Sequence, residues 1–102
     1  MARKAIRIIK WDEKALSSFE QALLWISEVS IQQAEGVELA ILKRIDKIAD
    51  NPEIYPPDKF KTNNTGGFRA FETHSYRVSY QYSETEIRIV QVRHVRQSPR
   101  LF

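Results

Sequence analysis

The side chains best suited to chemistry lie in the last third of the chain, where arginine and histidine alternate with apolar residues. His94 is the natural candidate for a general acid or base, because imidazole titrates near neutral pH. The alternative is a histidine that forms structural hydrogen bonds at the end of a strand, and His74 is a weaker candidate. With no cysteine and two histidines, we expect no thiolate nucleophile, no metal site and no cofactor.

Charge is segregated along the chain. Residues 12–58 include ten acidic and four basic residues, a net charge of −6, whereas residues 59–102 include eight basic and three acidic ones, a net charge of +5. The first eleven residues add four bases. If both ends of the chain join one sheet, the basic layer can bind phosphates or an acidic peptide. The alternative is solvated charge without a partner.

The first half predicts a strand and two helices. Alternation over Arg3–Trp11 predicts a short strand, and Asp12 is placed to cap the helix after it. Ser30 and Gln33 fit the capping box of a second helix, which Asn51-Pro52 ends. The apolar stripes of the two helices are Leu16, Phe19, Leu23 and Ile26, then Ala34, Val37, Ile41, Ile45 and Ile48. We expect Trp11 and Trp25 to be ordinary core residues.

The second half predicts a long loop and three strands. Residues 52–67 are rich in proline, asparagine and glycine and have no apolar period, which is typical of a connection. Strands over Phe68–Thr73, Tyr76–Tyr82 and Ile87–Val95 follow, and the short polar breaks between them indicate an antiparallel meander. In the middle strand the tyrosines and Val78 share the face expected to meet the helices, so Arg77 points away from the core.

These elements predict one domain over residues 1–102, because two halves would be too small to bury much surface. The expected fold is α+β, in the order β-α-α-β-β-β, with a helical hairpin packed on one face of a small, mainly antiparallel sheet. The other face is expected to be open to a partner. The N-terminus has no apolar stretch of the kind that a secretory signal or membrane span requires, so we expect a cytoplasmic protein without a membrane partner.

The order of elements resembles that of the RelE/ParE superfamily of type II toxins. The strand Tyr76-Arg77-Val78-Ser79-Tyr80 after a glycine-bearing loop and the ending Val92-Arg93-His94-Val95-Arg96-Gln97-Ser98-Pro99 carry the resemblance, which covers essentially the whole chain. It implies a toxin that arrests growth, either by metal-independent cleavage of messenger RNA on the ribosome or by binding DNA gyrase. It also implies a cognate antitoxin and a hetero-oligomer with it.

In the nuclease hypothesis, Arg77 matches the arginine that RelE-like nucleases place on the scissile phosphate. His94 is then the acid or base, and Glu72 is a substitute general base. The alternative is that Arg77 pairs with a carboxylate such as Glu72 and holds the fold. Further contacts to a nucleic acid or other target are expected from Lys59, Lys61, Arg69, Arg93, Arg96, Arg100 and, by stacking, Phe102.

Two departures from the nuclease pattern favour gyrase inhibition. The lysine pair that RelE places on the strand before the arginine falls, by offset from Arg77, on Phe68 and Ala70. The C-terminal tyrosine of several family nucleases is absent, because the chain ends in Leu101-Phe102. The sequence leaves both mechanisms open. A third hypothesis is a non-toxic protein-interaction module of the same fold.

Overall fold

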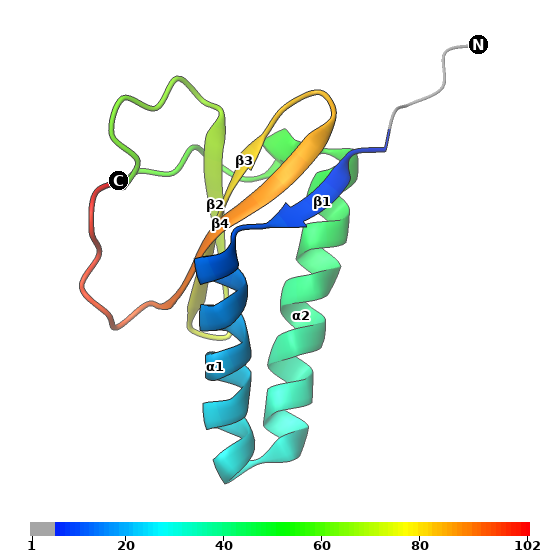
Figure 1. Ribbon diagram of the computed structural model, residues 1–102, viewed down its shortest axis with the longest axis vertical. Helices are drawn as coiled ribbons and strands as arrows, with labels where there is room; N and C mark the ends of the chain where they lie inside the picture. Colours follow the sequence, from blue (N-terminus) through cyan, green and yellow to red (C-terminus); the bar gives the residue numbers. More distant parts are fainter. Residues whose placement is uncertain (1–5) are drawn as a thin grey trace.

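The computed structural model describes residues 6–102, and it places two helices on one face of a four-stranded sheet (Figure 1). The elements are β1 (Ile8–Trp11), α1 (Glu13–Val29), α2 (Ile31–Asp50), a 3₁₀ turn at Pro52–Ile54, β2 (Phe68–Thr73), β3 (Tyr76–Tyr82) and β4 (Glu86–His94). The predicted α+β order is confirmed. Residues 3–5 of the first predicted strand lie outside the described residues, and the last strand is shifted by one residue from its predicted bounds.

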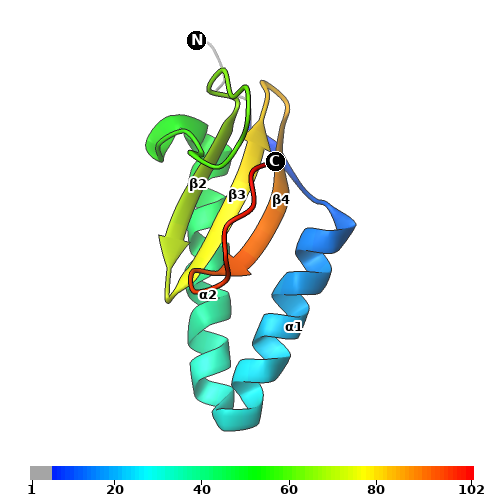
Figure 2. The same cartoon turned by 90° about the vertical axis from the view of Figure 1, so that its left-hand side faces the viewer.

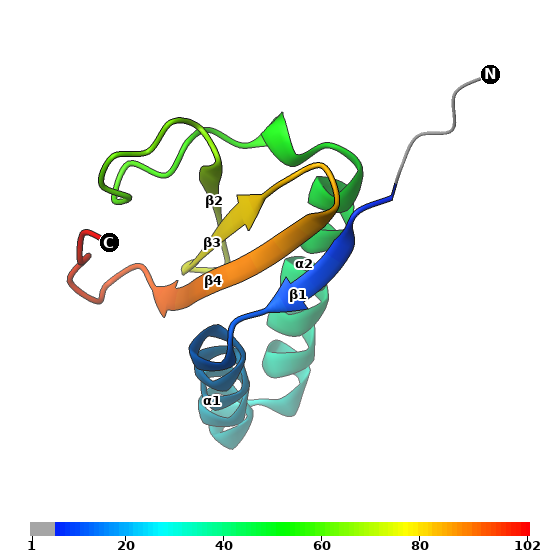
Figure 3. The same cartoon turned by 45° about the horizontal axis from the view of Figure 1, so that its top comes forward.

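The sheet has the order β1-β4-β3-β2. Strands β2, β3 and β4 form the predicted antiparallel meander, and β1 adds to it in parallel with β4, with Ile9 opposite Ile87. Figure 3 shows β1 lying along β4. The two basic segments of the chain therefore contribute neighbouring strands to one sheet, which is the arrangement that the charge argument assumed.

The helix ends follow local sequence signals only in part. The Ser30 hydroxyl accepts a hydrogen bond from the backbone N–H of Gln33 at 3.1 Å, so Ser30 caps α2 as predicted. Asp12 occupies the N-cap position of α1, but its side chain makes no capping hydrogen bond. Its carboxylate instead accepts a hydrogen bond from Arg88 on β4 at 3.1 Å. Asp12 therefore forms an ion pair with the sheet and does not cap α1 through its side chain.

The core lies between the helical hairpin and the sheet. All five predicted stripe residues of α2 are buried, and all but Ala34 belong to the core cluster that contains Val78 and Tyr80 of β3 and Ile87 of β4. On α1 the stripe is rotated slightly, so that Ala15 is buried and Leu16 is partly exposed. Trp11 stacks on Phe19, with ring centroids 5.2 Å apart, and lies against the core.

The two helices extend well beyond the end of the sheet (Figures 1 and 2). Apolar side chains near the hairpin tip therefore have no strand to cover them. Trp25 is 66% exposed, which contradicts its prediction as a core residue. Val29 and Ile31 are exposed for the same reason. No helix in residues 6–102 is both long and apolar enough to cross a membrane.

The face of the sheet away from the helices is covered, not open as predicted. Figure 2 shows the C-terminal segment, residues 95–102, running across this face, with the loop of residues 55–67 beside it. Arg77 does point away from the helices, yet only 9% of its side chain is exposed, and Ser79 is buried beside it. We call this side of the sheet the outer face.

We expect Tyr80→Phe to lower the free energy of unfolding by about 1–3 kcal/mol. The buried Tyr80 hydroxyl donates to the Pro52 carbonyl at 2.6 Å, and burial raises the pKa of this hydroxyl. The substitution leaves that carbonyl without its donor. Urea denaturation measures the effect. Tyr82→Phe is the matched control, because its hydroxyl bonds the exposed Glu53; equal losses in the two variants would contradict the assignment.

Candidate functional site

Arg77 is the centre of a polar cluster on the outer face. Its Nη2 donates to Asp58 Oδ1 at 2.8 Å, and its Nη1 donates to Glu72 Oε2 at 2.8 Å. Its guanidinium carbon lies 4.8 Å from the ring centroid of Phe60. The Asp58 side chain is fully buried, whereas that of Glu72 is half exposed. Both Nη atoms of Arg77 therefore donate to carboxylates, and an aromatic ring lies against the guanidinium.

Asp58 reaches this position because the long loop is folded against the edge of β2. The backbone N–H of Asp58 donates to the carbonyl of Phe68 at 2.8 Å. The Asn64 amide donates to the carbonyls of Asp58 and Phe68 and accepts from the N–H groups of Gly66 and Phe68. Gly66 has φ +106°, a conformation that side chains disfavour. Sequence reasoning missed Asp58 and Asn64, although the Asn-Asn-Thr-Gly-Gly run signalled a turn there.

The C-terminal residue closes the outer face. Phe102 donates its N–H to the Phe60 carbonyl at 3.0 Å, and its own carbonyl accepts from the Thr62 N–H at 2.7 Å. The Phe102 ring packs edge-on against Phe68 at 6.1 Å, and the Lys61 ammonium lies 5.6 Å from the Phe102 ring centroid. Phe102 and Lys61, both predicted to contact a target, thus hold the C-terminal segment against the loop.

The charge state of Asp58 is set by two opposing effects. Burial alone would raise the pKa of this carboxyl. Interactions with the Arg77 guanidinium, the Ser79 hydroxyl and the Phe60 backbone N–H outweigh burial, so the pKa of Asp58 is lowered from its ordinary value. Asp58 is therefore a carboxylate at neutral pH, and it forms a buried ion pair with Arg77.

His94 lies on the opposite side of the sheet from Arg77. It pairs across the strands with Tyr76, whose ring packs edge-on against the imidazole at 5.1 Å on the helix side. Its Nδ1 accepts a hydrogen bond from the backbone N–H of Arg96 at 3.1 Å. The sheet therefore separates the two residues that the nuclease hypothesis brings together, and Arg93, not His94, is the cross-strand neighbour of Arg77.

A β-bulge in β4 causes this arrangement. Tyr80 pairs with Ile89 but Ser79 pairs with Gln91, so Val90 has no partner in the register. A bulge shifts the alternation of side chains by one residue. Ile87 and Ile89 are buried on the helix side before the bulge, and Val92 takes that side after it. Uninterrupted alternation from Ile89 would have placed His94 on the outer face.

The basic residues predicted to bind a target fall into two groups. Lys59 and Arg69 belong to the loop side: Lys59 lies over the Phe60 ring, and Arg69 donates to the carbonyls of Tyr55 and Gly66. Arg93, Arg96 and Arg100 belong to the C-terminal side, near α1. Arg93 also stacks on Phe60, with its Cζ 5.1 Å from the ring centroid.

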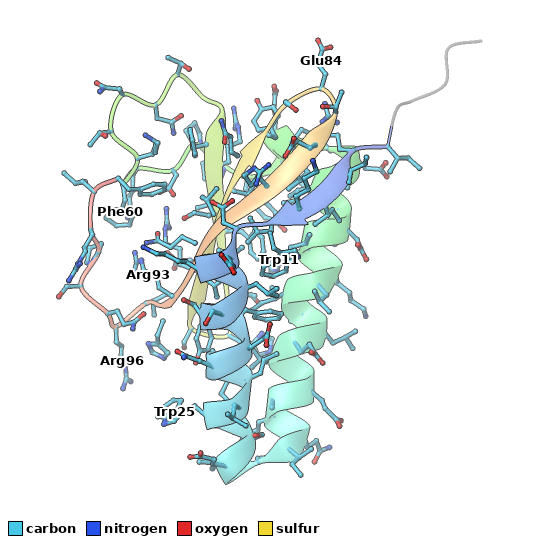
Figure 4. All side chains as sticks on the ribbon, viewed as in Figure 1. Trp11, Trp25, Phe60, Glu84, Arg93 and Arg96 are labelled. Atoms are coloured by element: carbon cyan, nitrogen blue, oxygen red, sulfur yellow. The ribbon has the colours of Figure 1, made fainter. Side chains whose placement is uncertain are left out.

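A groove runs along α1 between this helix and the C-terminal part of the chain, and we call it the basic groove. Figure 4 shows Trp25, Arg93 and Arg96 on this side of the molecule. The α1 wall is formed by Lys14, Ser18, Gln21 and Trp25, and the other wall by Val92, Arg93, His94, Arg96, Gln97 and Arg100. None of its described lining residues is acidic. In residues 6–102 no three His, Asp or Glu side chains are grouped to hold a metal ion.

Comparisons with known proteins identify the family to which this chain belongs. The protein-family model for the ParE toxin of type II toxin-antitoxin systems matches residues 9–99. The chain belongs to the ParE toxin family. It is therefore the toxin of a type II toxin–antitoxin system, with a cognate antitoxin as its partner. A search of curated protein sequences gives no match.

Two solved structures share the fold of this toxin. The chromosomal ParDE TA system from P. aeruginosa has a TM-score of 0.64 at 13% identity, over 87% of this chain and 96% of that chain. The YoeB dimer from Staphylococcus aureus has a TM-score of 0.53 at 19% identity, over 88% of this chain and 98% of that chain. The predicted RelE/ParE-like fold is confirmed.

We expect Asp58→Asn and Arg77→Met each to destabilise the toxin by about 3–5 kcal/mol, because each leaves a buried charge or polar group without its partner. Glu72→Gln is the control. Its carboxylate is half exposed, so its loss should cost no more than about 1 kcal/mol. Urea denaturation of the three purified variants checks the order. If Glu72→Gln costs as much as Asp58→Asn, the ion pair with Asp58 is not the dominant one.

The lowered pKa of Asp58 also predicts acid sensitivity. A carboxyl with a lower pKa in the folded than in the unfolded state stabilises the fold above its unfolded pKa of about 3.9. That contribution is lost as the pH falls through the folded pKa. The difference in unfolding free energy between the wild type and Asp58→Asn should therefore shrink between about pH 5 and pH 2. Denaturation curves across this range measure it, and a constant difference would contradict the assignment.

Proposed function

We propose that this toxin arrests growth by binding DNA gyrase and not by cutting messenger RNA. The observation that supports this choice most is the state of Arg77. A phosphate would have to displace Asp58 and Glu72, both within 2.8 Å, and the Phe60 ring that covers the guanidinium. We infer that Arg77 holds the loop on the sheet, which is the structural alternative that the sequence left open.

The other groups that a metal-independent nuclease requires are also dispersed. Cleavage needs a base, an acid and a cation within reach of one phosphate. His94 lies on the helix side of the sheet, and Glu72 is the ion-pair partner of Arg77 on the outer face. The positions of the RelE lysines are Phe68 and Ala70, both apolar. Catalytic roles for Arg77, His94 and Glu72 therefore stay predictions of the competing nuclease mechanism.

The basic groove is the surface we assign to gyrase. Binding hot spots between proteins are enriched in tryptophan and arginine, and they lie in pockets from which water is excluded. Trp25 is largely exposed there, on the same groove as Arg93 and Arg96. Arg100 and Lys14 extend the positive charge along the groove. The surface therefore combines an aromatic anchor with a cationic rim and fits an acidic protein segment.

Two assays on the purified toxin separate the mechanisms. We expect it to inhibit DNA supercoiling by gyrase, and we expect transcripts on translating ribosomes to stay intact. In cells, DNA breaks and the SOS response should precede any loss of messenger RNA. Codon-specific cleavage without an effect on supercoiling would overturn the proposal and favour the nuclease mechanism.

Charge reversal tests the surface. Arg96→Glu with Arg100→Glu should raise the toxin concentration needed to inhibit supercoiling by about tenfold or more, and it should weaken the salt dependence. The matched control is Lys43→Glu with Lys47→Glu, because both lysines are exposed on α2 and neither lines the basic groove. Circular dichroism verifies folding. Equal inhibition by both double variants would show that gyrase binds elsewhere.

A further inference from the structure

A tight turn at residues 94–97 follows β4 and fixes the position of the His94 ring. The Gln97 N–H donates to the His94 carbonyl at 3.0 Å, and the His94 N–H donates to Gln97 Oε1 at 3.0 Å. Arg93 Nη1 donates to the Gln97 carbonyl at 3.2 Å. The Val95 N–H donates to the Ser75 carbonyl at 2.8 Å, which ties the turn to the connection between β2 and β3. The turn therefore presents the imidazole in a defined orientation.

The same turn decides which ring nitrogen of His94 carries the proton. The backbone N–H of Arg96 donates to His94 Nδ1 at 3.1 Å. A backbone N–H can only donate, so Nδ1 is the acceptor, and in the neutral imidazole the proton lies on Nε2. Nε2 bonds no acceptor in residues 6–102, and it is not among their buried unpaired atoms. His94 therefore offers an accessible N–H donor.

His94 lines a hollow of about 680 Å³ in the basic groove. Its charged lining residues in the described part of the chain are Arg93 and Arg96, and Trp25 is an exposed apolar residue of its α1 wall. Arg93 is already engaged with backbone carbonyls and with the Phe60 ring. Arg96 is exposed, and Figure 4 shows it on the same side of α1 as Trp25. Arg96 is therefore the cation that a ligand in this hollow can reach.

These groups select an anionic oxygen ligand with an apolar neighbour. A carboxylate can accept from the Nε2–H of His94 and from a guanidinium, and hydrogen bonds between charged groups are stronger than neutral ones. The apolar surface of Trp25 and Ala22 in the same hollow suits an apolar side chain next to that carboxylate. A nucleic-acid backbone instead requires a succession of cations for successive phosphates. The hollow therefore fits an acidic peptide segment better than a nucleic acid.

We infer that His94 and Arg96 form a carboxylate-binding subsite of the basic groove. It takes an aspartate or glutamate side chain of the gyrase segment, and an apolar residue beside that acid packs on Trp25. The identity of the partner rests on the proposed function, whereas the subsite follows from the geometry of the turn. In this role His94 is a binding residue and donates through Nε2, while Nδ1 stays bonded to the backbone.

Two substitutions of His94 separate binding from bracing of the turn. Asparagine keeps an acceptor near the position of Nδ1 but has no donor at Nε2, whereas glutamine places an N–H donor near Nε2. His94→Asn should raise the toxin concentration that half-inhibits supercoiling by about tenfold or more. His94→Gln should stay at least about fivefold more inhibitory than His94→Asn. Full inhibition by His94→Asn, or weaker inhibition by His94→Gln than by His94→Asn, would show that His94 only braces the turn.

His74→Asn is the matched control for the loss of a histidine. His74 lies outside the basic groove and has φ +52°, a conformation that asparagine tolerates. This variant should inhibit supercoiling within about threefold of the wild type, because it leaves the subsite intact. Urea denaturation of all three variants verifies that they are folded. A loss in His74→Asn equal to that in His94→Asn would overturn the assignment.

A second experiment on the full toxin needs no gyrase. Its probes are the blocked peptides acetyl-Glu-Leu-Glu-amide and acetyl-Gln-Leu-Gln-amide and a double-stranded DNA oligonucleotide. Nitrogen NMR of the free toxin at pH 8 should show the His94 proton on Nε2. The glutamate peptide should shift that resonance, protect Trp25 from acrylamide quenching and bind about tenfold more tightly than the glutamine peptide. A proton on Nδ1, equal binding of the two peptides, or DNA binding that His94→Asn weakens would overturn the subsite.

The two experiments distinguish failure of the subsite from failure of the gyrase proposal. A toxin that binds the glutamate peptide through His94 but leaves supercoiling unaffected would refute gyrase as the target and support the subsite. A toxin that inhibits supercoiling equally well as wild type and as His94→Asn would support gyrase as the target and refute the subsite.

Discussion

The ion pair between Arg77 and Asp58 is the interaction on which the outer face of this toxin depends. Arg77 sits on the central strand pair, and Asp58 comes from the long loop nineteen residues earlier. Glu72, the other carboxylate partner of Arg77, is half exposed, so Asp58 is the partner that compensates the guanidinium charge in the buried part of the cluster. Once Asp58 is in place, Phe60 covers the guanidinium and offers its carbonyl to the N–H of Phe102. One ion pair thus fixes the loop, and the loop fixes the C-terminal segment.

The sequence predicted the parts of the fold that local rules determine. Alternation placed β2 and β3 with their observed bounds, and the Ser30 hydroxyl and Asn51-Pro52 marked the ends of α2. The covered outer face was not predictable in the same way. It arises from contacts between residues far apart in the chain, such as Asp58 with Arg77. The exposure of Trp25 has a similar origin, because it depends on how far the helices extend beyond the sheet. Helix periodicity does not indicate the length of this extension.

The candidate site shows the same limit at the level of single residues. Period-two alternation correctly predicted that Arg77 points away from the helices, but it could not show which residues would cover the outer face. For His94 the difficulty is the bulge at Val90, which moves His94 to the helix side and Arg93 to the outer side. The run Ile87-Arg88-Ile89-Val90-Gln91-Val92 contains the shift, since its apolar residues change from odd to even positions. Two adjacent apolar residues, Ile89 and Val90, are compatible with an uninterrupted strand as well.

The net charge of +3 conceals two surfaces of opposite sign that α1 holds apart. One face of α1 borders arginines of the C-terminal segment, and the other borders glutamates of α2. Attraction between charged surfaces acts mainly on the rate and specificity with which two molecules meet, whereas apolar burial supplies more of the binding affinity. Both faces of α1 also carry exposed apolar side chains, Trp25 on one and Leu24, beside Ile31 of α2, on the other. A charged ligand of either sign is therefore attracted by one face of α1 and repelled by the other.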